Sequence, residues 1–562
     1  KILPFICVQL VSCRDSLAQE YIFECIIQAF PDFFHIHTFE KLMTTLMTLH
    51  ATISVDTLLS SLTTRLAEFS HTEEGSKLFT ESKMISKCTE YSENIIKNSA
   101  CISRDEVIGL YKCVLKMALS ANIETLEKLN TAVETAKSVE DYLSIANATK
   151  ISSKSPLGAQ LLNYLRLFVS PNNEKSIILE LIQTPTFASI VQRMEHNGQS
   201  NVATTLLNSL NSERIKLNKA ENIRLILKLL DPLMSYPWIV GSEQTILAEQ
   251  QLLGTFPHYF ELQMEPTSTE IQVFSEVMCK FETGGAKQLI YRLPSLVMAL
   301  YKSIKSRRDV VDENYYERML MEISYPSISS LLNDYVDISL NLLIQGAMIA
   351  GSLEFSQSES CAYEFITQAF ALFEDAIVDS HKQVTALTLI FGAVQKMQCF
   401  TSSDKSGSNL RKRLIQASMS LLKRPDQSRM FVLSSNLHWG VRDKDSPEYI
   451  YDFAEAFACL QKARKIAAKC IDHVTEAQLF LDIIDQYIYF IEDSNAKNIV
   501  IDEKVFPTDV IKDMFTTVSH LLHTTKHKDM SSYLSIRANQ SLGYVKAIKQ
   551  FKSHFSNFTQ VF

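Results

Sequence analysis

The sequence predicts an all-α protein folded as an α-solenoid of HEAT-like helical repeats. The first observation is that glycine and proline are scarce. The 562-residue chain holds 14 of each, about 5% together against roughly 12% in an average protein. Apolar residues also recur with the helical period. Finally, the chain exceeds the about 250–300 residues at which a single hydrophobic core stops growing, so its helices are expected to stack in a row.

Amphipathic patterns place helices near both ends of the chain. These helices are predicted at residues 16–30, 38–50, 56–69, 448–470, 475–491 and 509–523. No run typical of a β-strand interrupts them. Helices of this length, with short connections, form repeat units of about 40–45 residues, which is the size of a HEAT-like pair.

The clearest helices lie between residues 336 and 400. Their apolar stripes consist of Val336, Leu340, Leu343, Ile344 and Ala347, then Ala362, Phe365, Ala369 and Leu372, then Leu387, Ile390, Phe391 and Val394. Gly351 is expected to end the first helix, and Ser380 with Gln383 to form a capping box at the start of the third. Gly346 marks a point where two helices approach closely.

One segment breaks this regularity. Pro232, Pro237, Pro257 and Pro266 fall within it, which predicts an irregular Pro-rich connection over residues 232–266. We therefore expect a helical solenoid over 1–231 and a second one over 267–562. The second is expected to begin at a capping box formed by Thr267 and Glu270.

Composition restricts the class of function. The formal net charge of −8 offers no basic surface for a phosphate backbone, so we expect no nucleic-acid partner. The 11 cysteines form no CxxC pair and fall mostly in apolar helical runs, which is typical of reduced core residues. No apolar run reaches the about 18 residues of a membrane helix. We therefore expect any membrane association to be peripheral.

One group of histidines has the spacing of a metal-binding motif. His520, His523 and His527 would share a helix face, and an α-helical metal-dependent hydrolase is the alternative they suggest. However, Thr524 stands where a zincin has its catalytic glutamate, and lysines flank the group. We interpret these histidines as an exposed polar face, and predict a protein that is not an enzyme and needs no cofactor and no metal.

Ordered sequence matches give the chain a family resemblance. They comprise Glu24–Gln28, Phe30–Asp32 and His35, then Tyr291–Leu296, Gln345–Ala347, Ala350–Gly351, Ala362–Phe365, Gln368–Phe370, Glu374–Asp375, Asp379–Ser380, Thr388–Ile390, Cys399–Phe400 and Leu421–Gln427. Together they resemble the large helical subunit of retromer, the vacuolar protein sorting 35 family. The chain, which begins at Lys1 without methionine, looks like the C-terminal two-thirds of that subunit.

The resemblance implies a scaffold in sorting transmembrane cargo from endosomes to the Golgi or the cell surface. Its partners would be a small subunit with a metallophosphoesterase fold, held by residues 267–562, and sorting nexins or a Rab GTPase at the membrane. The arrestin-like subunit would bind a more N-terminal region whose motif has no counterpart here. The expected location is the cytoplasm, at the cytosolic face of the endosome. The alternative is a HEAT-repeat subunit of another trafficking coat or of a nuclear transport receptor.

The resemblance and the residue types together suggest two sets of contact residues. For the small subunit they are Arg292, Tyr301, Trp439, Tyr487 and Tyr489, chosen because Trp, Tyr and Arg are enriched in binding hot spots. For a homodimer they are Glu374 and Asp375 on one copy and Lys423 and Arg424 on the other. The family often has a further lysine where this chain has Ser420. Asp379 is expected to cap the helix that follows it.

Overall fold

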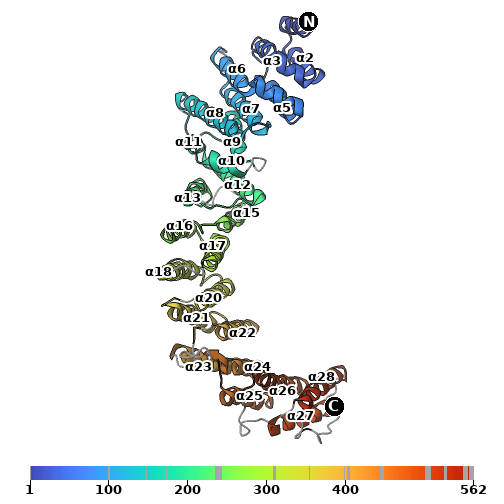
Figure 1. Ribbon diagram of the computed structural model, residues 1–562, viewed down its shortest axis with the longest axis vertical. Helices are drawn as coiled ribbons and strands as arrows, with labels where there is room; N and C mark the ends of the chain where they lie inside the picture. The colour runs from blue at the N-terminus through green and yellow to red at the C-terminus, as the bar shows by residue number, and fades with distance from the viewer. Residues whose placement is uncertain are drawn as a thin grey trace. The chain divides into compact units, whose positions relative to one another are not determined.

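The computed structural model confirms the all-α solenoid class. It describes residues 2–98, 102–146, 148–170, 175–234, 243–307, 312–353, 355–397, 399–400, 405–442, 449–499, 508–524, 528–548 and 555. The chain divides into two compact units, Lys1–Ala299 and Leu300–Phe562, and within each unit the helices follow one another in chain order (Figure 1). None of the helices described is long and apolar enough to cross a bilayer.

The first unit is a stack of helices. It contains α1 (Ile2–Ser12), α2 (Ser16–Ala29), α3 (Asp32–Leu46), α4 (Val55–Phe69), α5 (Glu73–Glu81), α6 (Met84–Asn98), α7 (Arg104–Ser120), α8 (Thr125–Ile145), α9 (Pro156–Phe168), α10 (Lys175–Ile182), α11 (Pro185–Gln192), α12 (His196–Glu213), α13 (Ala220–Leu229), α14 (Asp231–Met234), α15 (Glu243–Gly254), the 3₁₀ segment η1 (Phe256–Tyr259), α16 (Thr267–Phe281) and most of α17 (Ala286–Ser306).

Local sequence signals explain where several of these helices begin. Asp15 caps α2 by accepting a hydrogen bond from the Leu17 N–H, and Ser103 forms a capping box with Glu106 at the start of α7. Such caps satisfy backbone donors that have no partner inside the helix. The helix predicted over 38–50 instead begins at Asp32, directly after the N-cap residue Pro31. Proline fits this position because its lost N–H would have no helical partner there.

The sequence predicts an irregular connection over residues 232–266. The structure instead shows helices in the residues of this segment that it describes. Residues 235–242 lie outside the described residues, and α15 and η1 follow. The end of α15 approaches α17 closely: a Cβ built on Gly254 would lie 2.2 Å from the Tyr291 carbonyl oxygen. Glycine is therefore required at this contact. The domain boundary drawn at residue 267 stays a prediction.

The second unit continues with shorter and then longer helices. It contains α18 (Glu313–Glu317), the π-helical segment η2 (Arg318–Ser324), α19 (Tyr325–Ser329), α20 (Val336–Ala350), α21 (Ser358–Asp375), α22 (Ser380–Lys396), α23 (Lys405–Ser420), α24 (Arg424–Ser435), η3 (Asn436–His438), β1 (Trp439–Arg442), β2 (Tyr449–Tyr451), α25 (Phe453–Ala467), α26 (His473–Ala496), α27 (Thr508–Thr524) and α28 (Lys528–Ala547).

The sequence places α20, α21 and α22 correctly but misses one hairpin. Asp379 caps α22, as predicted, and its carboxylate accepts hydrogen bonds from the backbone of His381 and Lys382. Ser380, predicted to open the helix with a capping box, is instead its first helical residue. The helix predicted over 448–470 begins only at Phe453, because Tyr449–Tyr451 pair antiparallel with Trp439–Arg442. This hairpin interrupts the helical pattern, so the expectation of no strands is wrong here.

The helices of the second unit form two layers. Contacts run from α20 to α22, α24, α26 and α28 in turn, and we call these five helices the even-numbered layer. The odd-numbered helices α21, α23, α25 and α27 form the other layer. Each of them packs on the even-numbered helix that follows it in the chain. A hydrophobic cluster that includes Phe457, Ile484 and Phe515 fills the space between the layers from α24 to α28. This pairing is the helical-repeat arrangement that the sequence predicts.

Gly346 confirms the close helix approach predicted for α20. A Cβ at this position would lie 2.4 Å from Tyr301 Oη and 2.7 Å from the Phe365 ring. Tyr301 cannot simply move away, because its hydroxyl donates to the Leu342 carbonyl at 3.0 Å and accepts from Ser324 Oγ at 3.0 Å. The contact therefore joins α17, η2, α20 and α21.

Replacing Gly346 with alanine should destabilise the second unit. Overpacking a filled core costs about 1–3 kcal/mol, and the better helix propensity of alanine returns up to about 1 kcal/mol. We expect a net loss of about 1–2 kcal/mol in urea unfolding followed by circular dichroism. Gly392→Ala in α22 is the matched control, because nothing lies within 4 Å of its built Cβ. Equal stability of the two variants would contradict the packing argument.

Candidate protein-binding surfaces

Arg292 is a structural residue of the first unit. Its side chain is fully buried, with Nε donating to Gln250 Oε1 at 2.6 Å and Nη1 donating to the Thr283 carbonyl at 2.8 Å. Burial lowers the pKa of the guanidinium to about 10, because a low-dielectric surrounding disfavours the charged form. The guanidinium ties α17 to α15 and to the end of α16, and it presents no surface to a partner.

Tyr301 and Tyr487 are also buried. The Tyr301 hydroxyl hydrogen-bonds to Leu342 and Ser324 next to Gly346. Tyr487 packs on the Phe457 ring with centroids 5.2 Å apart. Burial raises the pKa of both phenols. The Tyr487 hydroxyl has no hydrogen-bond partner among the described residues. In the folded chain neither side chain is available for direct contact with another protein.

Trp439 anchors the hairpin to α26. Its ring stacks on Phe490 with centroids 4.3 Å apart, and Nε1 donates to Asp493 Oδ2 at 2.9 Å. Only 8% of the residue is exposed. The sequence therefore identified an aromatic anchor, but one that holds β1 on the second unit.

Tyr489 is the exposed member of the predicted set. It is 52% exposed and lines a groove of about 340 Å³ between α26 and α28. Tyr544, 62% exposed on α28, lines the same groove, and sequence reasoning missed it. The signal that could have found it is the apolar and aromatic content of α28, which holds Met530, Tyr533, Ile536 and Tyr544, all exposed.

The floor of this groove is rigidly cross-linked. Arg537 Nη2 bridges Asp482 Oδ1 at 2.8 Å and Asp485 Oδ2 at 2.6 Å. Ser541 Oγ donates to the other Asp485 oxygen at 2.6 Å. The partly buried ion pairs hold α28 on α26, the two helices that carry the tyrosines. Exposed aromatic side chains that flank a groove are typical of binding surfaces.

The four predicted self-association residues lie at two turns of the second unit. Glu374 and Asp375 end α21, and Lys423 and Arg424 begin α24. Two of the four already have partners within the chain: Arg413 Nη2 lies 2.7 Å from Glu374 Oε2, and Arg424 Nη1 donates to the Lys469 carbonyl at 2.7 Å. Asp375 and Lys423 are exposed. The structure does not bring the acidic and basic pairs together within the chain.

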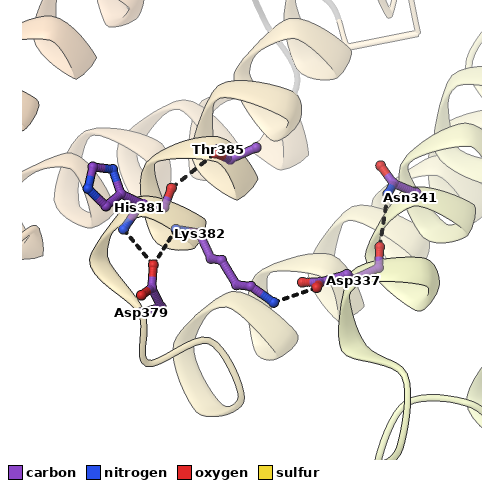
Figure 2. A network of polar contacts seen from close by, with 6 residues as sticks. All are labelled: Asp337, Asn341, Asp379, His381, Lys382 and Thr385. Carbon is purple, nitrogen blue, oxygen red and sulfur yellow. Dashed lines mark hydrogen bonds and ion pairs between the residues drawn. The ribbon is translucent and has the colours of Figure 1, made fainter.

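The neighbouring turns are joined by polar contacts that Figure 2 shows. Lys382 Nζ, from α22, lies 2.6 Å from Asp337 Oδ2 at the start of α20. Asp379 Oδ1 accepts hydrogen bonds from the His381 and Lys382 backbone at 2.9 and 3.0 Å. The backbone donors at Lys382 and His381 lower the pKa of Asp379, and Asp337 raises the pKa of Lys382. These contacts fix the turn between α21 and α22.

The histidine alternative gains no support from the described residues. His520 and His523 are exposed on α27, and His527 lies outside the described residues. Among the residues that the structure describes, no group of three or more His, Cys, Asp or Glu side chains is placed to hold a metal ion.

Comparisons with known proteins identify relatives along most of the chain. The family model described as vacuolar protein sorting-associated protein 35 matches residues 1–513. Protein 35A of that name from Arabidopsis thaliana is 26% identical over 515 residues, which cover 87% of this chain and 62% of the relative. The Schizosaccharomyces pombe protein 35 is 25% identical over 539 residues, which cover 89% of this chain and 62% of the relative. The chain thus spans less than two thirds of the length of both relatives.

Two solved helical structures align with most of the chain at low identity. A circular tandem repeat protein, described as having a novel repeat topology and enhanced subunit contact surfaces, aligns at 13% identity with a TM-score of 0.28, over 89% of this chain and 99% of that chain. A structure described as SYS-1 aligns at 10% identity with a TM-score of 0.25, over 97% of this chain and 99% of that chain.

Proposed function

Because the chain belongs to the vacuolar protein sorting-associated protein 35 family, we propose that it is a non-enzymatic scaffold subunit of the retromer coat. The observation that carries this proposal is the match of the family model to residues 1–513. The stacked helices support it physically, since a solenoid offers long continuous surfaces that suit the binding of other proteins. The coat would act in retrograde sorting of transmembrane cargo, at the cytosolic face of endosomes.

The proposed partner of the second unit is the small subunit with a metallophosphoesterase fold. We place its contact on the even-numbered layer, at the groove that Tyr489 and Tyr544 flank. Of the other residues suggested for this contact, Trp439 and Tyr487 are buried in contact with α26, the helix that carries Tyr489, whereas the buried Arg292 and Tyr301 stabilise other helices and are not proposed as part of this surface. The arrestin-like subunit is a further proposed partner of the family, and sorting nexins or a Rab GTPase would recruit the assembly to the membrane.

Calorimetry between this chain and the small phosphoesterase-fold subunit of the same organism tests the proposal. We expect one-to-one binding that buries over about 2,000 Å², as a permanent subunit contact does, and a negative heat-capacity change from the apolar surface removed from water. If the well-folded chain does not bind the small subunit, the proposal is wrong and a role in another trafficking coat is favoured. Circular dichroism confirms the folded state in either case.

The same proposal includes self-association through the turns that carry Glu374, Asp375, Lys423 and Arg424. A two-fold contact must be self-complementary, and these turns carry both signs of charge. Exposed ion pairs contribute only about 0–1 kcal/mol each. The four charged residues alone would therefore give a weak contact.

A further inference from the structure

The groove between α26 and α28 lies near the C-terminal ends of both helices. Asp482 pairs with Arg537 at 2.8 Å, and Asp485 accepts from Ser541 Oγ at 2.6 Å. These contacts advance along both helices in the same direction, so the two helices run parallel. The groove extends from these contacts to within about one turn of the end of each helix. Because the C-terminal end of a helix carries partial negative charge, the backbone at this end of the groove favours a cation.

Carboxylates outnumber basic groups at this groove. Among the described residues that line it, Arg537 is the basic one, and its guanidinium is shared by Asp482 and Asp485. Glu492 also lines the groove, and its side chain is exposed. Within the part of the chain that the structure describes, Glu492 forms no ion pair. The groove therefore has one carboxylate whose charge is not compensated.

Aromatic and apolar groups line the rest of the groove. Tyr489 and Tyr544 flank it, and both are more than half exposed. The face of an aromatic ring carries negative potential and attracts a cation placed over it. Ile488 also lines the groove and is only 6% exposed, so it offers an apolar patch to the methylene stem of a long side chain. An apolar patch with anionic groups around it fits lysine or arginine.

Other occupants fit this groove less well. An apolar side chain pressed into it would remove Glu492 from water without supplying a countercharge, and a buried unpaired charge is costly. An acidic side chain would be repelled by Glu492 and by the Asp482 and Asp485 carboxylates, because like charges placed together across an interface oppose binding. A cationic side chain compensates the charge of Glu492 and contacts both tyrosine rings at once.

We propose that the groove receives a lysine or arginine side chain of the small phosphoesterase-fold subunit. The stem of this side chain lies on Ile488, and its charged head lies between the Tyr489 and Tyr544 rings and pairs with Glu492. The inference rests on the proposed function and adds to it the chemistry that the partner must present. It assigns Glu492 a role in selecting the partner, which nothing in its residue type reveals.

The first test reverses the charge of the groove in calorimetry with the small subunit. Glu492→Lys should raise the dissociation constant by at least about 30-fold, because a cation then meets a cation. Glu492→Gln should raise it about five-fold and make binding less dependent on salt, since one ion pair is lost. Glu134→Lys is the matched control: it changes the net charge equally at an exposed position of α8 in the first unit, and it should bind within about two-fold of wild type.

A double-mutant cycle identifies the partner's cation. Each surface lysine and arginine of the small subunit is replaced by alanine in turn, and each variant is titrated into the wild-type chain and into Glu492→Gln. One replacement should weaken binding to the wild-type chain by at least about ten-fold and binding to Glu492→Gln by only about two-fold, because the glutamine variant has already lost the same pair. Circular dichroism should be unchanged for all variants of the chain.

The outcomes separate this inference from the function on which it rests. A wild-type chain that does not bind the small subunit ends the proposed function, and the cation site with it. Tight binding by the wild type with an equal dissociation constant for Glu492→Lys overturns only the cation site. Equal weakening by Glu492→Lys and Glu134→Lys also overturns it, because the effect would then come from net charge and not from the groove.

Discussion

Arg292→Ala is expected to lower the free energy of unfolding of the first unit by about 3–5 kcal/mol. The guanidinium is fully buried and donates to Gln250, Thr283 and Leu233. Each buried acceptor left without a donor costs about 1–3 kcal/mol, and the deleted side chain leaves a cavity. Urea unfolding measures the total loss, and hydrogen exchange should show it concentrated in α14, α15 and α17.

The cost of burying the Arg292 charge opposes the stabilisation by its hydrogen bonds, so different substitutions of Arg292 should lower the free energy of unfolding by different amounts. Burial holds the pKa of Arg292 down to about 10, which means that keeping the group charged costs free energy. Arg292→Met removes this cost and fills most of the volume, so its loss should be smaller than that of the alanine variant. Arg224→Ala, which breaks a surface ion pair with Glu276 at 2.9 Å, should cost only about 0–1 kcal/mol. A loss at Arg292 as small as at Arg224 would contradict the structural role.

The helices could be predicted from the sequence where apolar periodicity is strong and caps are local. α20, α21 and α22 begin and end close to the predicted positions. The apolar residues that define these helices, and the residues that start and stop them, are close neighbours in the sequence. The hairpin of Trp439–Arg442 with Tyr449–Tyr451 could not be read in the same way. Its strands have three or four residues each, and such short apolar runs are ambiguous between helix and strand.

The exposure of the suggested contact residues could not be predicted from the sequence, because residue type does not reveal burial. Tyr487 and Tyr489 are two positions apart on α26, so their side chains point about 200° apart on the helix. One is buried and the other exposed, yet the sequence suggested both. Arg292 illustrates the same limit: arginine is common in hot spots, and here its donors are used inside the first unit. Which face meets the next repeat depends on packing between helices distant in the chain.

Removing both groove tyrosines should weaken binding of the small phosphoesterase-fold subunit by at least about 100-fold, because exposed aromatic anchors dominate interface energetics. The variant is Tyr489→Ala with Tyr544→Ala, measured by calorimetry against the wild-type chain. Both side chains are more than half exposed, so their loss should leave the free energy of unfolding nearly unchanged.

Tyr533→Ala provides the matched control for this groove. Tyr533 is 59% exposed on the same helix α28 but does not line the groove, so its removal should leave the affinity within about two-fold of wild type. If the double variant binds as tightly as the wild type, the small subunit contacts another part of the second unit. If Tyr533→Ala weakens binding as much as the double variant does, the contact covers the outer face of α28 and the groove is only one part of it.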